Sequence, residues 1–190
     1  KGYVDPVLRD VRSTLDAIKA RTPGLSKTLK PRRNLWGQKI INSGALGPDI
    51  ISPFYTSLYD PHPVDDELWA LRAKITKHPD ALQFSNAPSG SPIELSEDQR
   101  DWYHKRAGEL SLEKLNFLIV KNNKVWELQK KMKGKEWAIE KIRNEVRVAR
   151  KRAEKELLIH PEYGKELMNQ ILQLKFDKQN EKIDRLRSMQ

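Results

Sequence analysis

Histidine is the commonest metal ligand in proteins and a frequent acid–base catalyst. The chain has four of them, at His62, His78, His104 and His160. A zinc site needs two or three ligands close together, for example at positions i and i+4 of a helix, and these four are far apart in sequence. His104, with Asp101 and Glu109 nearby, is the strongest metal candidate. An exposed helical histidine explains it better, and we expect no metal.

Nucleophile and phosphate-binding motifs are missing from the sequence as well. There is no G-x-S-x-G pattern, and Ser89–Gly90–Ser91 lies in a proline-flanked stretch without a suitable base. Gly44 and Gly47 lack the pattern and the following helix of a phosphate-binding loop. The absence of cysteine excludes disulfides and thiolate metal sites. We therefore expect no cofactor and no catalytic residue in this segment.

One group of basic residues precedes a tryptophan in the first half of the chain. Lys27, Lys30, Arg32 and Arg33 lie a few positions before Trp36, in a stretch that is loop-like in sequence. Such a cluster is typical of a contact with phosphates or with an acidic partner.

A second basic group lies on a long predicted helix. Arg143, Arg147 and Arg150 share one strip of this helix, with Lys151 beside it. Such a strip can follow a nucleic-acid backbone, and each phosphate contact adds salt-dependent affinity. Four glutamates alternate with these residues, at Glu140, Glu145, Glu154 and Glu156. Alternating charge is also typical of a solvated or ion-paired helix, so both interpretations stay open.

Aromatic side chains gather in the first half of the chain, where they could anchor it in a partner's grooves as interface hot spots do. The predicted docking residues are Arg32, Arg33, Trp36, Phe54, Tyr55 and Trp69. The alternative is that the aromatic residues pack on the chain's own helices, and the sequence does not decide between the two.

The distribution of proline and glycine divides the chain into two regions. Ten of the eleven prolines and six of the nine glycines precede position 93. Both residue types interrupt regular structure. Residues 1–92 are therefore predicted to form an irregular docking segment with short helices near 4–21 and 64–77, and residues 93–190 a helical region.

Apolar spacing and end signals predict the helices of the second region. Ser96 and Gln99 fit a capping box that begins a helix, which we expect to end near Arg106 because Gly108 follows. Further helices are predicted over 112–119, 125–132 and 135–158, the last being long and charged with one narrow apolar face. After Pro161, a final helix carries one apolar stripe, made of Leu167, Ile171, Leu174, Ile183 and Leu186.

Composition indicates a mainly α, extended chain. Hydrophobic residues make up 37% and charged residues 33%, which is too little apolar material for a thick core. The narrow helical stripes are therefore expected to be buried against partner molecules. The net charge of +10 favours nucleic acid or acidic proteins as partners. No stretch approaches the roughly 18 apolar residues of a membrane span. Because the chain starts Lys1–Gly2–Tyr3, we expect it to begin within a longer polypeptide.

An ordered series of turn and packing motifs resembles a known family. It comprises Lys30–Pro31–Arg32–Arg33–Asn34–Leu35–Trp36–Gly37, Leu46–Gly47–Pro48, Ser52–Pro53–Phe54, Asp60–Pro61, Glu67–Leu68, Ile93–Glu94–Leu95–Ser96, Gln99, Tyr103, Ala107–Gly108 and then Lys135, Ile142, Arg147, Ala149 and Arg150. This series, over roughly residues 25–155, resembles the C-terminal region of large tailed-phage internal virion proteins of the ejection or tape-measure-like kind. Trp36 stands where Phe is expected, and Ser96 where Thr is commoner.

The resemblance implies a structural role in the virion. It implies docking to portal, tail or core subunits, assembly as a homo-oligomeric ring, storage in the capsid interior or at the portal–tail axis, and genome ejection through the host envelope. It implies no catalytic residue here, although family members can carry enzymatic domains elsewhere. The alternative that the residues leave open is a basic helical adaptor that binds nucleic acid.

Overall fold

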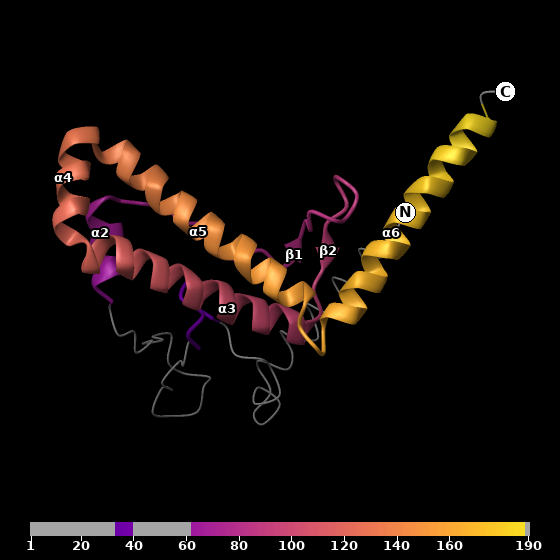
Figure 1. Cartoon of the computed structure of the whole chain (residues 1–190), viewed down its shortest axis with the longest axis horizontal. Helices are drawn as coiled ribbons and strands as arrows, with labels where there is room; N and C mark the ends of the chain where they lie inside the picture. Colours follow the sequence, from indigo (N-terminus) through magenta and orange to yellow (C-terminus); the bar gives the residue numbers. More distant parts are fainter. Residues whose placement is uncertain (1–32, 40–61, 189–190) are drawn as a thin grey trace, which may run out of the picture. The chain divides into compact units, whose positions relative to one another are not determined.

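The computed structural model describes residues 33–39 and 62–188 of the chain (Figure 1). These residues form α2 (Pro63–Ala70), β1 (Ala81–Leu82), β2 (Ile93–Glu94), α3 (Glu97–Leu115), the π-helix η2 (Asn116–Lys121), α4 (Asn123–Lys133), α5 (Lys135–Leu158) and α6 (Gly164–Arg187). The mainly helical class is confirmed. The predicted helix near 4–21 and the predicted anchors Arg32, Phe54 and Tyr55 lie outside the described residues.

The described residues from Arg33 onward belong to one compact unit. Residues 62–92, which were assigned to the docking segment, therefore pack together with the helices that follow them. The unit is organised around α3 and α5, which lie side by side in Figure 1. Ion pairs Arg106–Glu156 and Lys114–Glu145 join the middle of α3 to the end of α5 and the end of α3 to the middle of α5, so the two helices run antiparallel.

Small side chains line the contact between α3 and α5. Ala107 and Ser111 on α3, and Ala149 and Ala153 on α5, are fully buried. The Ser111 hydroxyl donates to the carbonyl oxygen of Ala107 at 2.6 Å, so burial leaves it satisfied. Small residues let two helix backbones approach closely, which explains why a narrow apolar face is enough on α5.

The start of α3 is confirmed, but its predicted end near Gly108 is wrong. Ser96 and Gln99 form the expected capping box, with each side chain accepting from the other residue's backbone N–H at 3.0 and 3.3 Å. The helix continues through Gly108 to Leu115. A Cβ atom at Gly108 would lie 2.2 Å from the backbone nitrogen of Gly37. Glycine is needed here for a close tertiary approach and not for ending a helix.

The connection between α3 and α5 consists of the π-helix η2 followed by α4. The side-chain amides of Asn122 and Asn123 donate to the carbonyl oxygens of Phe117 and Ile119, at 3.0 and 3.3 Å. The carbonyl oxygen of Phe117 also accepts from the backbone N–H of Asn122 at 3.1 Å, the i→i+5 bond of a π-turn, so the side-chain amides reinforce the end of η2. Gly134, with φ of 86°, separates α4 from α5.

The second predicted helix, 64–77, is shorter in the structure. α2 begins at Pro63, the position at which proline suits a helix, and ends at Ala70. Arg72 then adopts a left-handed φ of 50°, and the chain continues without helix to residue 79. This non-helical run lets His78 reach Arg150 on α5.

Two apolar clusters form the core of the described unit. The first joins the β1–β2 ribbon, the start of α3, the end of α5 and the start of α6: Leu82, Phe84, Ile93, Leu95, Tyr103, Ala107, Leu110, Ala149, Ala153, Leu157, Leu167 and Ile171. The second joins the 33–39 segment and α2 to η2, α4 and the start of α5: Trp36, Val64, Leu71, Leu115, Ile119, Trp126, Ala138, Ile139, Ile142 and Val146. The apolar face of α5 is thus buried within one chain, and the expectation that it needs a partner is wrong.

The β1–β2 ribbon supplies the apolar residues that close the first cluster. Its strands are antiparallel, with Ala81 opposite Glu94 and Leu82 opposite Ile93. Leu82 and Ile93 are both buried. The Pro-rich stretch before α3 therefore contributes to the chain's own core.

Candidate interaction surfaces

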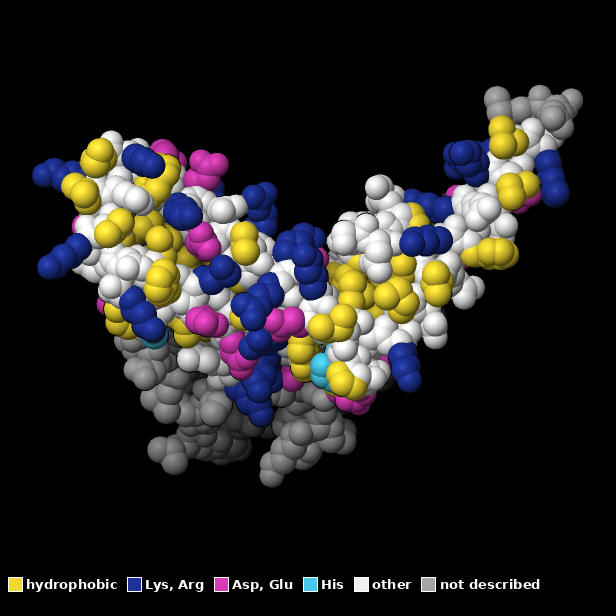
Figure 2. All heavy atoms as spheres, in the orientation of Figure 1, with side chains coloured by type: hydrophobic (Ala, Val, Ile, Leu, Met, Phe, Trp, Pro, Cys, Tyr) yellow, Lys and Arg dark blue, Asp and Glu magenta, His cyan; other side chains and the backbone are white. Residues whose placement is uncertain are grey.

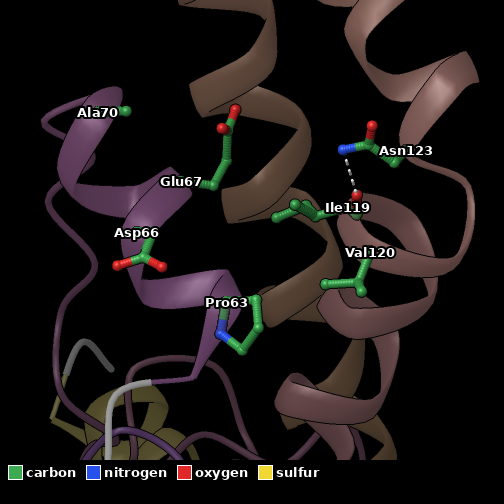
Figure 3. A pocket seen from close by; sticks show the side chains of 7 residues that line it. All are labelled: Pro63, Asp66, Glu67, Ala70, Ile119, Val120 and Asn123. Carbon is green, nitrogen blue, oxygen red and sulfur yellow. Dashed lines mark hydrogen bonds between the residues drawn. The ribbon is translucent and has the colours of Figure 1, made fainter.

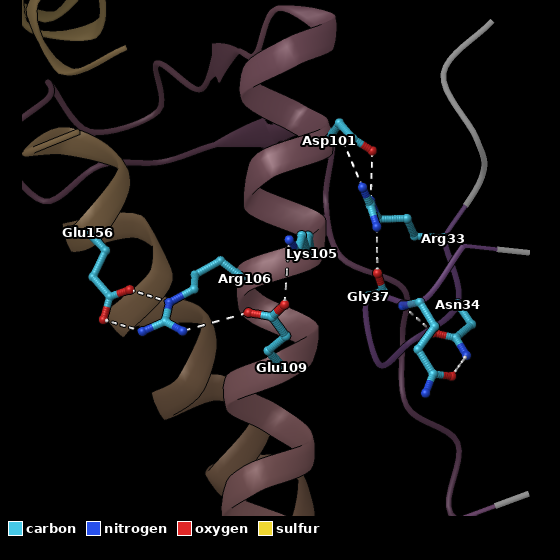
Figure 4. Close-up of polar contacts among 9 residues, drawn as sticks. Arg33, Asn34, Gly37, Asp101, Lys105, Arg106, Glu109 and Glu156 are labelled. Atoms are coloured by element: carbon cyan, nitrogen blue, oxygen red, sulfur yellow. Dashed lines mark hydrogen bonds and ion pairs between the residues drawn. The ribbon is translucent and has the colours of Figure 1, made fainter. Parts of the chain in front are cut away.

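Arg33 is held inside the chain by a two-pronged ion pair. Its Nε and Nη2 donate to the two carboxylate oxygens of Asp101 on α3, at 2.7 and 2.8 Å, and its Nη1 donates to the carbonyl oxygen of Gly37 at 2.8 Å (Figure 4). The Arg33 side chain is 8% exposed. A planar guanidinium suits this geometry, because it can bond both carboxylate oxygens and a carbonyl at once.

Trp36 is also used within the chain. It is 3% exposed, and its indole N–H donates to Asp65 of α2 at 2.9 Å. Next to it, Gly37 has φ of 76° and lies against the backbone of Lys105 on α3. The prediction that Arg33 and Trp36 dock on a partner is wrong, because both fasten residues 33–39 to α2 and α3. The sequence signal for this contact is the pair of glycines, Gly37 and Gly108, whose backbones approach closely in the structure. Their spacing in the sequence does not show that they meet.

Trp69 differs from the other predicted anchors that the structure describes. It lies near the end of α2 and is 81% exposed. Its docking role stays a prediction, with a side chain that is accessible.

The four residues of the predicted nucleic-acid strip do not act together. Arg143, Arg147 and Lys151 are exposed on α5. Arg150 instead turns toward residues 76–78: its Nε donates to His78 Nδ1 at 3.1 Å, and its other nitrogens donate to the hydroxyl and carbonyl oxygens of Thr76. Burial lowers the pKa of Arg150. Arg150 is half-buried and engaged by residues 76–78, and its nucleic-acid contact stays a prediction.

His78 completes this link between the 33–39 segment and α5. Because Nδ1 accepts from Arg150, Nε2 carries the proton and donates to the carbonyl oxygen of Leu35 at 3.0 Å. Burial lowers the pKa of His78 to about 4, and the nearby Arg150 charge acts in the same direction. A neutral imidazole is thus required at neutral pH.

A shallow basic groove runs along the exposed side of α5. Its lining is Arg147, Val148, Lys151, Arg152 and Lys155, around a volume of about 440 Å³. Part of its charge is neutralised nearby, since Lys151 pairs with Glu154 at 2.7 Å and Arg152 with Glu156 at 2.9 Å. The alternation of charge that the sequence indicated is therefore realised as local ion pairs.

A second depression lies between α2 and η2 (Figure 3). It is lined by Pro63, Asp66, Glu67, Ala70, Ile119, Val120 and Asn123, with a volume of about 420 Å³. Glu67 accepts hydrogen bonds from the indole of Trp126 and from Lys130, both at 2.9 Å. The carboxylate of Glu67 is therefore engaged in structural contacts. The depression is open and mostly apolar, and Glu67 is not available in it as an acid or base.

The outward face of α4 carries an apolar stripe. Val125, Leu128 and Met132 recur at helical spacing and are exposed, Met132 to 74%. Lys124, Lys131 and Lys133 flank this stripe, and Lys133 lies over the ring of Trp137. Figure 2 shows hydrophobic side chains over α4 with basic side chains among them.

The helix α6 has two apolar faces where the sequence predicted one stripe. Leu167 and Ile171 are fully buried in the first cluster, and Leu174 packs against it. The other face carries Leu172, Phe176, Ile183 and Leu186, which are all exposed. Figure 2 shows hydrophobic side chains on the surface of this helix. The single stripe joining Leu167 to Leu186 is wrong, because at 100° per residue Ile183 and Leu186 fall on a different side of the helix.

The metal candidate at His104 is not assembled. Its Nε2 lies 3.3 Å from the carbonyl oxygen of Pro79, and burial lowers its pKa. Asp101 is paired with Arg33, while Glu109 lies beside Lys105 and Arg106 (Figure 4). Within residues 33–39 and 62–188, no three histidine or acidic side chains gather as metal ligands would.

No helix in the described ranges combines the length and apolar content needed to cross a bilayer. No family model, curated protein or solved structure matches the chain. The fold and surfaces define a mainly helical chain with exposed apolar helix faces.

Proposed function

We propose that this chain is a structural virion segment of a phage internal or ejection protein. It docks on portal, tail or other core subunits and helps the genome to enter the host. The observation that supports docking best is the pair of exposed apolar stripes on α4 and α6. Contiguous exposed apolar side chains between polar flanks are typical of interaction sites.

The size of the stripes fits a repeated assembly. Full burial of one such side chain contributes about 1.5–3 kcal/mol. The few side chains of one stripe would therefore stabilise a single contact of modest affinity. A homo-oligomeric ring multiplies that contact around its symmetry axis. The proposed location is the capsid interior or the portal–tail axis, and the host envelope after ejection.

We propose no enzymatic activity for this segment, although the full polypeptide can carry an enzyme elsewhere. The titratable side chains of the described region support this view, since Glu67, Asp101, Glu156 and His78 are each engaged in structural contacts.

The test is incorporation into particles. The full-length protein would carry Leu128→Glu with Met132→Glu on α4, and purified virions would be assayed by quantitative mass spectrometry. We expect loss of the protein from particles or loss of infectivity. Lys131→Gln, on the same helix beside the stripe, is the matched control and should behave as the parent does. Absence of the parent protein from virions would disprove the virion role.

The second candidate is a basic helical adaptor that binds nucleic acid, which the groove along α5 favours. Arg147 and Lys155 are its accessible cations. Affinity for duplex DNA should then fall steeply with salt concentration and drop further for Arg147→Glu with Lys155→Glu. Lys165→Glu with Lys175→Glu, which reverses two exposed lysines on α6, is the charge-matched control. Weak binding that all three proteins share would count against this candidate.

A further inference from the structure

The outer face of α6 is presented on a fixed base. Glu166, in the first turn, accepts from the Gln99 side-chain amide of α3 at 2.8 Å, and Leu167 and Ile171 are buried in the first core cluster. Lys178 donates to the carbonyl oxygen of Ser89. The helix then continues to Arg187 with its second apolar face exposed, Phe176 to 63%. The first part of α6, which is packed on the core, therefore fixes the direction in which the exposed apolar face of residues 172–187 points.

The spacing of this stripe is that of a coiled-coil seam. Its positions alternate by four and three residues: Leu172, Phe176, Gln179, Ile183 and Leu186. These occupy heptad positions d, a, d, a and d, which insert between the side chains of a facing helix. Gln179 is the one polar member of the seam, and a polar seam residue fixes the register of a pair.

The residues flanking the seam carry one sign of charge. At the e and g positions stand Gln173, Lys175, Asn180, Lys182 and Arg187. The acidic residues of this half, Asp177, Glu181 and Asp184, fall at b and f, away from the seam. The seam is therefore bordered by cations and neutral amides. Side chains at e and g decide partner choice in coiled coils, so these cations should set which helix can bind.

A second copy of this helix is a poor occupant of the seam. In a parallel pair, Lys182 at g would face Arg187 at e of the other copy. In an antiparallel pair, lysine would face lysine. Like charges in these positions oppose association, whereas opposite charges favour it.

We propose that the outer face of α6, residues 172–187, docks a partner helix whose apolar stripe is flanked by aspartate and glutamate. The partner's acids pair with Lys175, Lys182 and Arg187, while its apolar stripe covers Phe176 and Ile183. This inference rests on the proposed docking function and names the chemistry of one partner.

The experiment uses a designed probe and the full chain. A fluorescein-labelled peptide of about three heptads carries leucine at a and d, one glutamine opposite Gln179, and glutamate at every e and g position. Its twin carries lysine at e and g. Anisotropy titration should show the glutamate peptide binding at least about tenfold more tightly, which corresponds to three favourable ion pairs.

Two variants separate the seam from the rest of the helix. Phe176→Ser with Ile183→Ser should abolish binding of the glutamate peptide, while Asp177→Ser, on the opposite side, should leave it unchanged. Circular dichroism and thermal melting establish that each variant is folded. Raising the salt concentration should weaken binding, since the flanking pairs are exposed.

Four results would overturn the inference. They are equal binding of the two peptides, binding of neither, self-association of the chain that Phe176→Ser with Ile183→Ser removes, and Phe176-dependent binding to phosphatidylglycerol vesicles without peptide binding. If the chain nevertheless enters virions, the proposed function stands and the partner assignment fails. If it binds the glutamate peptide but is absent from virions, the reverse holds.

Discussion

At the scale of single residues, a few buried or half-buried polar side chains tie the described unit together. Arg33 links the 33–39 segment to α3, and Arg150 with His78 links the same segment to α5. Each link joins positions far apart in the chain, so each contributes to holding the tertiary arrangement. Their loss should be visible as a change in the free energy of unfolding.

Arg33→Ala should destabilise the chain by about 2 kcal/mol, because it removes a buried partner of Asp101 and a bond to Gly37. Urea denaturation followed by circular dichroism measures this. Arg147→Ala, at an exposed position of α5, is the control and should change the value by less than about 0.5 kcal/mol. Equal effects of the two substitutions would contradict the structural role of Arg33.

His78 should make stability fall in mild acid. The pKa of His78 is lowered to about 4 in the folded chain from an ordinary value of 6.5. Between these values the unfolded chain binds a proton and the folded one does not, so stability is present above about pH 6.5 and is lost as the pH falls toward 4. His104, whose pKa burial also lowers, acts in the same direction.

His78→Gln should therefore flatten this pH dependence. A glutamine amide can still accept from Arg150 and donate to Leu35, but it does not titrate. The loss of unfolding free energy between about pH 7 and pH 4 should be smaller by about 2 kcal/mol than in the parent chain. Superimposable stability–pH curves for the two proteins would refute the assignment.

Tyr103 offers a prediction of the opposite sign. Its ring is fully buried, burial raises the pKa of its hydroxyl, and no described residue accepts or donates a hydrogen bond to that hydroxyl. Removing an unsatisfied buried polar group lowers a desolvation cost. Tyr103→Phe should thus leave stability unchanged or raise it by about 1 kcal/mol, in thermal melts. A loss above this size would mean that the hydroxyl has a partner after all.

At the scale of elements, local signals located the start of α3 better than its end. Ser96 and Gln99 identify the start of α3 because their capping bonds are local. Gly108 misleads, because its role is a contact with Gly37 and Trp36 that lies far away in sequence. The apolar period of α5 predicted its buried face correctly. It could not show that α3 and the β1–β2 ribbon would cover that face.

For the candidate surfaces too, the sequence predicted features that depend on local spacing and missed those that depend on contacts between distant segments. The exposed α5 cations Arg143, Arg147 and Lys151 were found from spacing alone. Spacing could not show that Arg150 turns inward, since its partner His78 belongs to a distant segment. The α4 stripe and the second face of α6 were missed as surfaces, because a helical period shows that a face is apolar and not which side the chain covers.

Gly108→Ala tests the close approach at α3. In an ordinary helix this change stabilises by about 1 kcal/mol. Here the new Cβ would meet the backbone of Trp36 and Gly37 at 2.2 Å, which neither helix nor turn can accommodate without moving. We expect a loss of about 2–4 kcal/mol in urea denaturation. Glu113→Ala, at an exposed position of the same helix, should be nearly neutral, and stabilisation by Gly108→Ala would show that the turn yields.

At the scale of the whole molecule, the apolar side chains of the described residues divide into those that are buried within the chain and those that are exposed on its helices. The two faces of α6 carry this division within a single helix. Leu167 and Ile171 close the first core cluster together with α3 and α5. Phe176 and Ile183 are exposed and are members of neither cluster. Stability and docking should therefore be separable by substitution.

Leu167→Ala should cost about 2–5 kcal/mol of unfolding free energy, because it opens a cavity beside residues that cannot collapse into it. Ile183→Ala removes a similar amount of hydrocarbon two heptads away, yet should change the value by less than about 0.5 kcal/mol, since the parent residue is exposed and is a member of neither core cluster. Urea denaturation of both variants at the same protein concentration makes the comparison direct. A large loss for Ile183→Ala that grows with protein concentration would mean that copies of the chain already bury this face in one another. A large loss independent of concentration would mean that the chain folds back upon it. Only a small loss leaves the outer face of α6 for a different molecule.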